Sequence, residues 1–342
     1  MDFALTEAQH ELKTQATEAI ARELGGAGMS FLDYGLLLEA LGPSPVMLAE
    51  VVPPRTIARY GTPEQRARWL GPLLAADLIS TAALTEPQAG SDTRGFTCKG
   101  VPGPDGYRIT GKKKWIKFGG TADLITLMVV EPGDGGKPQH TRFIVERDAS
   151  PWKSRELPSI GIRNVSFAEL EFVDVLVPRE NMLAGPGQAL QAFAAGIEAS
   201  RPFVGLTAVG LAGHALDIAA SYTRGRIAFG RPLARFQAIQ LQLAEAATEL
   251  AAARLLCLHA LWLMDQGQRC PREASMAKFY ATEASVRVCN AAMDAMGAMG
   301  LAEEGGVERC WRDARMLTVI DGTSGKNRLI VGRELLGQAA FV

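Results

Sequence analysis

A helical seam in the second half of the chain constrains the fold more than any other feature. Apolar or small residues recur there in alternating steps of three and four. The series is Leu243, Ala246, Leu250, Ala253, Cys257, Ala260 and Met264. This spacing puts one apolar stripe along a long helix, and alanine at every second position lets a neighbouring helix approach closely. The sequence therefore predicts a packed antiparallel helical bundle.

The predicted bundle occupies the C-terminal part of the chain. It follows Gly185-Pro186-Gly187, a helix-breaking sequence. We expect four helices, with a short fifth near 303–317. The four are expected at about 188–224, 235–266, 272–297 and 323–338.

The middle of the chain has the composition of strands. Short β-rich runs occur at 107–110, 124–130 and 142–145, and turn sequences rich in glycine and aspartate separate them. Residues 168–175 alternate between apolar and polar and end at Val177-Pro178. These features predict a small antiparallel β-domain of a size typical of domains.

The N-terminal part is predicted to be helical. Thr6-Glu7-Ala8 opens a helix that Gly25-Gly26-Ala27-Gly28 breaks, and Ser30 caps a second helix running to about Leu41. Thr62-Pro63-Glu64-Gln65 starts a third, with proline at its first position. We expect an α+β multidomain protein with a helical domain at 1–80, a β-domain at 81–184 and a four-helix bundle at 185–342.

Composition excludes several classes of function. The formal net charge is −1, which gives no electrostatic reason to bind nucleic acid or an anionic membrane surface. Lys112-Lys113-Lys114 is the single basic run, and we expect it at a solvated strand end. The five cysteines form no CxxC pair and the four histidines show no metal-ligand spacing, so no metal site is expected. Without a signal-peptide pattern or a membrane-length apolar run, the expected location is the cytoplasm.

Asp321 is the leading candidate for chemistry. The apolar run 316–320 leads to this single carboxylate, which is followed by Gly322. Thr323 and Ser324 can then cap a new helix. A carboxylate held by apolar neighbours near backbone N–H groups can act as a general base. The alternative is an ordinary helix-capping aspartate.

Three other segments combine residues suited to a cofactor. Residues 84–92, Leu-Thr-Glu-Pro-Gln-Ala-Gly-Ser-Asp, place small residues and hydroxyls at a strand exit, or form a common polar loop. Residues 115–120 put a tryptophan and a lysine at a strand end, unless the tryptophan is a core residue. Residues 226–240 link two bundle helices and carry arginines suited to a diphosphate, or to solvation of a helix end.

In this order and spacing, the four motifs resemble the acyl-CoA dehydrogenase family over nearly the whole chain. The resemblance implies an N-terminal helical domain, a middle β-domain and a C-terminal four-helix bundle, with FAD as cofactor. It implies oxidation of an acyl thioester to a trans-2-enoyl thioester, with electrons passing to an acceptor of the electron-transfer flavoprotein type. It also implies dinucleotide contacts from a neighbouring subunit, and therefore a dimer or tetramer.

The resemblance assigns roles to individual residues. Asp321 falls where most members have the glutamate that removes the α-proton. Substrate contacts are expected from Ser91, Ser200 and Arg201, and none is assigned to a metal. Cofactor contacts are expected from Leu84, Thr85, Gly90, Ser91, Trp115, Lys117, Arg226, Phe229, Gln237, Gly297 and Thr323. Of these, Arg226, Phe229 and Gln237 would hold the diphosphate and adenine of the neighbouring subunit's FAD.

This chain departs from the family pattern in four ways. Asp321 is one methylene shorter than glutamate, and Lys117 replaces a threonine that bonds flavin N5. Around the dinucleotide, Asp294, Gly325 and Ala228 replace glutamine, glutamine and threonine. A helix expected between Arg22 and Leu24 is absent, which would widen the acyl pocket for bulky or carrier-bound groups.

The departures leave alternatives open. One is a weakly catalytic or non-catalytic subunit of a hetero-oligomeric dehydrogenase, and another is a flavin oxidase or monooxygenase acting on a non-thioester substrate. The sequence also leaves open whether coenzyme A or an acyl carrier protein delivers the acyl group, and how tightly FAD is held.

Overall fold

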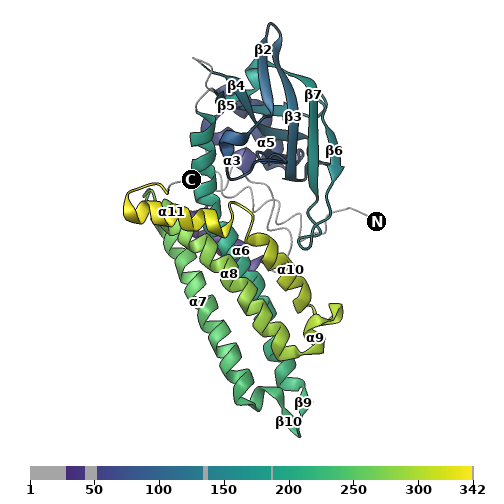
Figure 1. The fold of residues 1–342 in the computed structure, drawn as a ribbon, viewed down its shortest axis with the longest axis vertical. Coiled ribbons are helices and arrows are strands. Elements are labelled where there is room, and N and C mark those ends of the chain that lie inside the picture. Colours follow the sequence, from purple (N-terminus) through teal and green to yellow (C-terminus); the bar gives the residue numbers. More distant parts are fainter. Residues whose placement is uncertain (1–27, 43–51, 134–137, 186–187, 341–342) are drawn as a thin grey trace. The chain divides into compact units, whose positions relative to one another are not determined.

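The computed structural model describes residues 28–42, 52–133, 138–185 and 188–340. The chain separates into two compact units, drawn in Figure 1. In the first, described residues 52–159 and 163–196 carry the sheet. In the second, residues 30–42, 160–162 and 197–340 carry the helical bundle. The predicted α+β fold class, with helices, then a sheet, then a bundle, is confirmed.

Short helices precede the sheet in the first unit. The predicted start at Thr62 is confirmed, because its hydroxyl accepts from the Gln65 backbone N–H at 3.2 Å while the Gln65 side chain accepts from the Thr62 backbone N–H at 3.1 Å. The Gln65 amide also donates to the carbonyls of Glu180 and Met182. The elements are α3 (Val52–Tyr60), α4 (Pro63–Gln65), the π-helical turn η4 (Arg66–Leu70) and α5 (Gly71–Leu74).

Among the described residues, eight strands form one sheet in the order β6-β7-β3-β2-β4-β5-β8, with β1 paired to β4. The strands are β1 (Ser80–Ala83), β2 (Lys99–Gly103), β3 (Gly106–Lys117), β4 (Leu124–Pro132), β5 (Pro138–Glu146), β6 (Lys153–Glu156), β7 (Phe167–Val177) and β8 (Met182–Ala184). Short 3-10 turns are η5 (Thr93–Gly95) and η7 (Arg179–Asn181). All four predicted runs are strands. The sheet is not wholly antiparallel, because β1 runs parallel to β4 and β2 joins β4 in parallel at one residue pair.

One apolar core stabilises the sheet. Ile125, Leu127, Phe143 and Val145 on the paired strands β4 and β5 are all fully buried. Phe172 on β7 belongs to the same cluster. Burial of side chains of this size contributes about 1.5–3 kcal/mol each, so the sheet is a firm support for the loops at its strand ends.

The second unit is the predicted bundle. Its long helices are α6 (Ala189–Gly225), which begins in the first unit, α7 (Gln237–Asp265), α8 (Pro271–Met296) and α11 (Ser324–Leu336), with α10 (Val307–Leu317) as the expected shorter helix. Sequence reasoning missed small elements between them, namely β9 (Ile227–Ala228), β10 (Arg231–Pro232), η8 (Leu233–Arg235), α9 (Ala298–Leu301) and η9 (Glu303–Gly305).

The alanine-rich seam of α7 packs against α8. Ala253, Cys257 and Ala260 are completely buried, whereas the larger Leu243 and Leu250 are only half-buried. On α8 the opposing buried positions are also small, including Ala274, Ala277, Ala281 and Ala284. The small side chains allow close approach, as the spacing predicted.

The helix predicted from Ser30 to Leu41 is α2 (Phe31–Ala40). The Ser30 hydroxyl accepts from the Asp33 backbone N–H at 3.0 Å. The Asp265 carboxylate, at the end of α7, accepts from the N–H groups of Phe31 and Leu32 at 2.7 and 3.0 Å. A carboxylate also suits the positive end of the α2 dipole. The helix expected at Thr6, the glycine break and the gap after Arg22 lie outside the described residues.

Two helices in the described part of the chain could cross a membrane by length and composition alone. In α6, from Gly196 to Gly225, 61% of the apolar window is buried inside the fold. In α7 the buried share is 28%. The core position of α6 explains its composition, whereas α7 keeps an exposed apolar face.

Gly210 on α6 lies at a contact that admits no side chain, since a Cβ there would be 1.8 Å from the Glu39 carbonyl oxygen at the end of α2. We expect Gly210→Ala to lower the free energy of unfolding by about 1–3 kcal/mol, as overpacking does, measured by urea denaturation. Gly213→Ala is the matched control, because its Cβ would meet only Leu250 at 3.7 Å. Equal stability of the two variants would contradict this account of the contact.

Candidate active site

The first predicted motif forms a loop directly after β1. The Thr85 carbonyl accepts from the backbone N–H of Lys114 at 2.8 Å, which places the loop beside the part of β3 that carries Trp115. Two backbone hydrogen bonds close the turn 86–89. Gly90 then returns to Thr85, since a Cβ on Gly90 would lie 3.4 Å from the Thr85 methyl group. These cofactor candidates are therefore neighbours.

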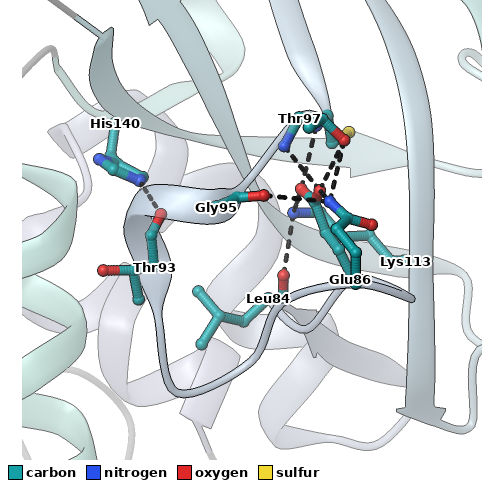
Figure 2. Close-up of polar contacts among 9 residues, drawn as sticks. Leu84, Glu86, Thr93, Gly95, Thr97, Lys113 and His140 are labelled. Atoms are coloured by element: carbon teal, nitrogen blue, oxygen red, sulfur yellow. Dashed lines mark hydrogen bonds and ion pairs between the residues drawn. The ribbon is translucent and has the colours of Figure 1, made fainter. Parts of the chain in front are cut away.

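A buried ion pair supports this loop (Figure 2). Lys113 Nζ donates to the Glu86 carboxylate at 2.8 Å and to the Leu84 carbonyl at 2.9 Å. Neither charged side chain is more than 1% exposed. The carboxylate accepts further hydrogen bonds from the Gln88 amide, the Thr97 backbone and hydroxyl, and the Cys98 backbone. Because both buried charges are hydrogen-bonded, the Lys113–Glu86 pair fixes residues 84–86, the start of the motif.

The expectation of a solvated basic run at 112–114 is wrong for its central residue. Lys112 forms a partly exposed pair with Glu171, but successive strand side chains alternate, so Lys113 points into the core. Burial alone would raise the pKa of the Glu86 carboxyl, but Lys113 and the hydrogen bonds outweigh it and hold this pKa below its usual value. Lys113 follows the buried Ile109 by four residues, which is two periods of the strand alternation, and this spacing was the available sequence signal.

Trp115 is not a core residue. Its side chain is 51% exposed and its backbone is left-handed, with φ of 63°. The register between β3 and β7 shifts between Lys113 and Ile116, so a bulge turns Trp115 away from the alternating pattern. A large, exposed aromatic side chain in a rigid sheet offers a flat apolar surface beside the Thr85 loop.

The remaining candidates of the first unit lie near this surface or on the next turn. Lys117 is half-buried at the end of β3, paired in register with Phe167. The backbone carbonyl of Ser166 accepts from the Phe118 backbone N–H. The buried Ser166 hydroxyl has no hydrogen-bond partner within the described ranges. Ser91 is exposed, one residue before the Asp92 cap of η5. The Ser166 hydroxyl, which lies at the end of β3 without a described partner, can hydrogen-bond a polar group of a ligand.

In the second unit, Asp321 lies in the connection between α10 and α11. Its backbone is left-handed at φ 54°, and Gly322 follows at φ 98°. Thr323 caps α11, as predicted, by accepting from the Lys326 backbone N–H at 3.3 Å. The Asp321 side chain is half-buried. It is not itself the cap of α11, so the helix-capping alternative is wrong.

Arg201 and Ser200 lie on α6. Arg201 is 7% exposed and donates to the Ser275 hydroxyl at 3.2 Å, while its Nε has no partner among the described residues. Burial lowers the pKa of its guanidinium, and the nearby Asp321 carboxylate opposes that shift. The Ser200 hydroxyl donates to the Ile197 carbonyl of its own helix at 3.0 Å. The structure thus brings Arg201 near Asp321.

Sequence reasoning missed Lys278 on α8. It is completely buried and donates to the carbonyls of Thr318 and Gly322, on either side of Asp321. Burial lowers the pKa of the Lys278 ammonium to about 8, while Asp321 and Glu283 raise it and Arg201 lowers it further. The sequence signal that could have revealed Lys278 was its position: it is four residues after Ala274, on a helix face otherwise made of small residues.

The residues that were predicted to hold the FAD diphosphate lie far from Asp321 within the second unit. Arg226, Phe229 and Gln237 surround the β9–β10 hairpin, where Phe229 is 91% exposed. The helix from Arg201 to Gly225 rises about 36 Å, so one chain does not bring this group to Asp321. Figure 1 draws the hairpin at one end of the bundle and α11 at the other.

Residues that depart from the family pattern are also placed. Gly297 is a predicted cofactor residue and not one of the departures; it is the C-cap of α8, with φ 59°. Asp294, three residues earlier, has an exposed side chain. Gly325 is exposed in the first turn of α11, and Ala228 is half-buried in the hairpin. In the part of the chain that the structure describes, no group of three His, Cys, Asp or Glu side chains is placed to hold a metal ion.

Comparison with known proteins identifies the family. Models of the acyl-CoA dehydrogenase N-terminal, middle and C-terminal domains match residues 16–77, 81–175 and 189–336. A probable acyl-CoA dehydrogenase of Bacillus subtilis is 35% identical, over 92% of this chain and 85% of its own. The structure of butyryl-CoA dehydrogenase from Megasphaera elsdenii is 28% identical with a TM-score of 0.89, covering 98% of this chain and 100% of its own. A glutaryl-CoA dehydrogenase from Mycobacterium smegmatis in complex with FADH2 is 26% identical with a TM-score of 0.91, covering 99% and 88%.

The chain belongs to the acyl-CoA dehydrogenase family. It is an oxidoreductase of the acyl-CoA dehydrogenase type, and its cofactor is FAD. The first unit fits that group, because the exposed Trp115 ring, the fixed Thr85 loop and the unmatched Ser166 hydroxyl offer an aromatic surface and polar contacts together.

Removal of one partner of the buried Lys113–Glu86 ion pair should strongly destabilise the protein. We expect Lys113→Met to lower the free energy of unfolding by about 3–5 kcal/mol, because the Glu86 charge would remain buried without its partner, and to reduce the FAD content of the purified protein. Lys112→Met is the control on the same strand and should change stability by less than about 1 kcal/mol. Urea denaturation and flavin absorbance measure both effects, and similar results for the two lysines would contradict this role of the pair.

Proposed function

We propose that this protein oxidises an acyl thioester between its α and β carbons, with Asp321 as the base that removes the α-proton. The observation that carries the proposal is a half-buried carboxylate on a left-handed turn between two helices, near the buried cations Arg201 and Lys278. A carboxylate in such a position can take a proton from a substrate as a general base.

The chain's own groups account for binding and proton transfer. The Asp321 carboxylate takes the α-proton, and its backbone N–H donates to the thioester carbonyl as negative charge develops on that oxygen. Arg201, with an unmatched Nε in the described part of the chain, contributes positive potential at the same end of the bundle. Ser91 and Ser200 are the proposed polar contacts to the substrate.

The cofactor supplies the redox half of the reaction, because FAD when bound accepts the hydride that leaves the β carbon. The Leu84–Thr85 segment, Gly90, Ser91 and Trp115 would contact its flavin, as would Lys117 at the end of β3 and Thr323 in the bundle. Loss of a proton and a hydride leaves a trans-2-enoyl thioester. Electrons then leave to an acceptor of the electron-transfer flavoprotein type.

Aspartate sets a geometric condition on catalysis. Its carboxylate is one methylene closer to the backbone than that of glutamate, and a misplacement near 1 Å can lower a rate by about 100-fold. The substrate's α carbon must therefore lie closer to the 318–322 turn. We place no limit on chain length, and either coenzyme A or an acyl carrier protein can present the thioester.

We further propose a homo-oligomer, because the second group of FAD contacts is distant from the first. Arg226, Phe229 and Gln237 would hold the diphosphate and adenine of a FAD bound mainly to a neighbouring subunit, and Gly297 is a further proposed cofactor contact. The exposed face of α7 suits such an interface, with Leu241, Leu255 and Trp262 between 49% and 65% exposed. These positions are separated by multiples of seven residues and so lie along one face.

The base assignment has a direct test in anaerobic flavin bleaching. The purified wild type should be yellow, and one of a panel of acyl-CoA thioesters should bleach it. Asp321→Asn should keep the flavin absorbance while the bleaching rate falls by roughly 10²–10⁴-fold, the contribution of general base catalysis. Asp217→Asn removes an exposed carboxylate of α6 and should leave the rate unchanged.

Three outcomes would point away from this function. Bleaching that persists in Asp321→Asn rejects Asp321 as the base. A colourless, soluble wild type favours the partner-subunit alternative. Bleaching only by non-thioester substrates, with rapid oxygen consumption, favours the oxidase alternative.

The proposed interface predicts a loss of assembly when charge enters the α7 face. Leu255→Glu should lower the solution mass measured by light scattering and also the FAD content, because burial of an unpaired carboxylate in an interface is unfavourable. Val173→Glu, at a similarly exposed aliphatic residue of β7, is the control and should assemble normally. An unchanged mass for Leu255→Glu would exclude this face as the interface.

A further inference from the structure

Lys278 joins two carbonyl groups that lie on opposite sides of Asp321. Its Nζ donates to the Thr318 oxygen at 2.9 Å and to the Gly322 oxygen at 2.8 Å. The side chain comes from the start of the third turn of α8 and is completely buried. The lysine therefore closes the turn 318–322 from a different helix, without contacting solvent.

The turn needs such a restraint because its backbone is unusual. Asp321 and Gly322 are both left-handed, a conformation that costs a non-glycine residue about 1 kcal/mol or more unless its surroundings enforce it. Besides Lys278, the Asn327 amide donates to the Gly322 carbonyl at 2.8 Å and to the Thr323 carbonyl at 3.1 Å. The ammonium and the amide together bond the carbonyls of Thr318, Gly322 and Thr323.

Charge explains why a lysine is found here and not an apolar residue. Thr318 is the C-cap of α10, so its carbonyl lies at the negative end of that helix and lacks a partner within it. An ammonium group is the favoured partner for such a carbonyl. The charged groups that face Lys278 are Asp321 in the turn, Glu283 on α8 and Arg201 on α6.

We propose that Lys278 is a positioning residue, which holds the backbone of Asp321 so that its carboxylate and N–H meet the substrate correctly. This inference rests on the proposed function of Asp321. Lys278 lies behind the turn, bonded to carbonyls, so it acts on the reaction through Asp321 and takes no proton from the substrate. Loss of the two contacts frees the turn to leave the left-handed conformation and withdraw the base.

The test compares Lys278→Met, Lys278→Arg and wild type, each as the full chain with FAD. Anaerobic stopped-flow should show flavin reduction by the active acyl-CoA slowed about 100-fold in Lys278→Met, the effect expected of a displacement near 1 Å. The KM and the Kd for a trans-2-enoyl-CoA should stay unchanged, because the positioning affects the reacting geometry and not binding. Lys278→Arg keeps the charge and the donors and should recover part of the rate.

A second measurement does not depend on activity. Hydrogen–deuterium exchange should be faster at Val319 and Ile320 in Lys278→Met, because their N–H groups bond to the Met316 carbonyl only while the turn is held. Lys326→Met is the matched control, since it removes a positive charge from the first turn of α11 while Lys278 keeps both carbonyl contacts. If Lys278→Met does not fold, Lys278→Gln, which is too short to reach both carbonyls, replaces it.

The outcomes separate the two proposals. If no acyl-CoA reduces the wild type, the proposed function fails, and exchange alone decides whether Lys278 holds the turn. If the wild type is reduced and Lys278→Met is reduced equally fast, the positioning role is wrong. Equal exchange at 319–320 in the variant and wild type also overturns it, as does an equal slowing in Lys326→Met, which would assign the effect to charge alone.

Discussion

Hydrogen bonds from buried ammonium groups to loop carbonyls are the interactions on which both parts of the candidate site depend. In the first unit Lys113 reaches the Leu84 carbonyl, and in the second Lys278 reaches those of Thr318 and Gly322. A lysine loses much hydration energy when it is buried, so it persists only where its partners are well placed. Each loop is thereby tied to a rigid strand or helix, β3 for the first loop and α8 for the second.

The two lysines are buried by different means. Lys113 has a carboxylate partner, and the pair is saturated by five further donor–acceptor contacts around Glu86 and Leu84. Lys278 donates to two carbonyl groups in the described part of the chain, and burial lowers its pKa to about 8. The first lysine stabilises a cofactor loop through charge neutralisation, whereas the second relies on the end of a helix and on more distant carboxylates.

Much of the fold could be predicted because its signals are local. Ser30 and Thr62 cap the helices expected of them, and the seam from Leu243 to Met264 packs as its spacing implies. The position of Asp321 between two helices also followed from a short sequence.

The features that were missed depend on pairing between segments that are distant in the sequence. The bulge that exposes Trp115 needs β7 as a partner, and the parallel contact of β1 with β4 pairs residues that are 44 positions apart, as Ser80 and Leu124 are. Burial of Lys113 and Lys278 likewise depends on groups far away in sequence.

The length of α6 has a genetic consequence. The β9–β10 hairpin, which follows Arg226, and α11, which follows Asp321, lie at opposite ends of the bundle (Figure 1), and on the proposed arrangement each chain contributes these two residues to two different FAD sites. A chain that lacks one function can then be complemented by a chain that lacks the other. Co-expression of two individually inactive alleles would restore one intact centre per mixed dimer, while a single defective allele would impair centres shared with its normal neighbour.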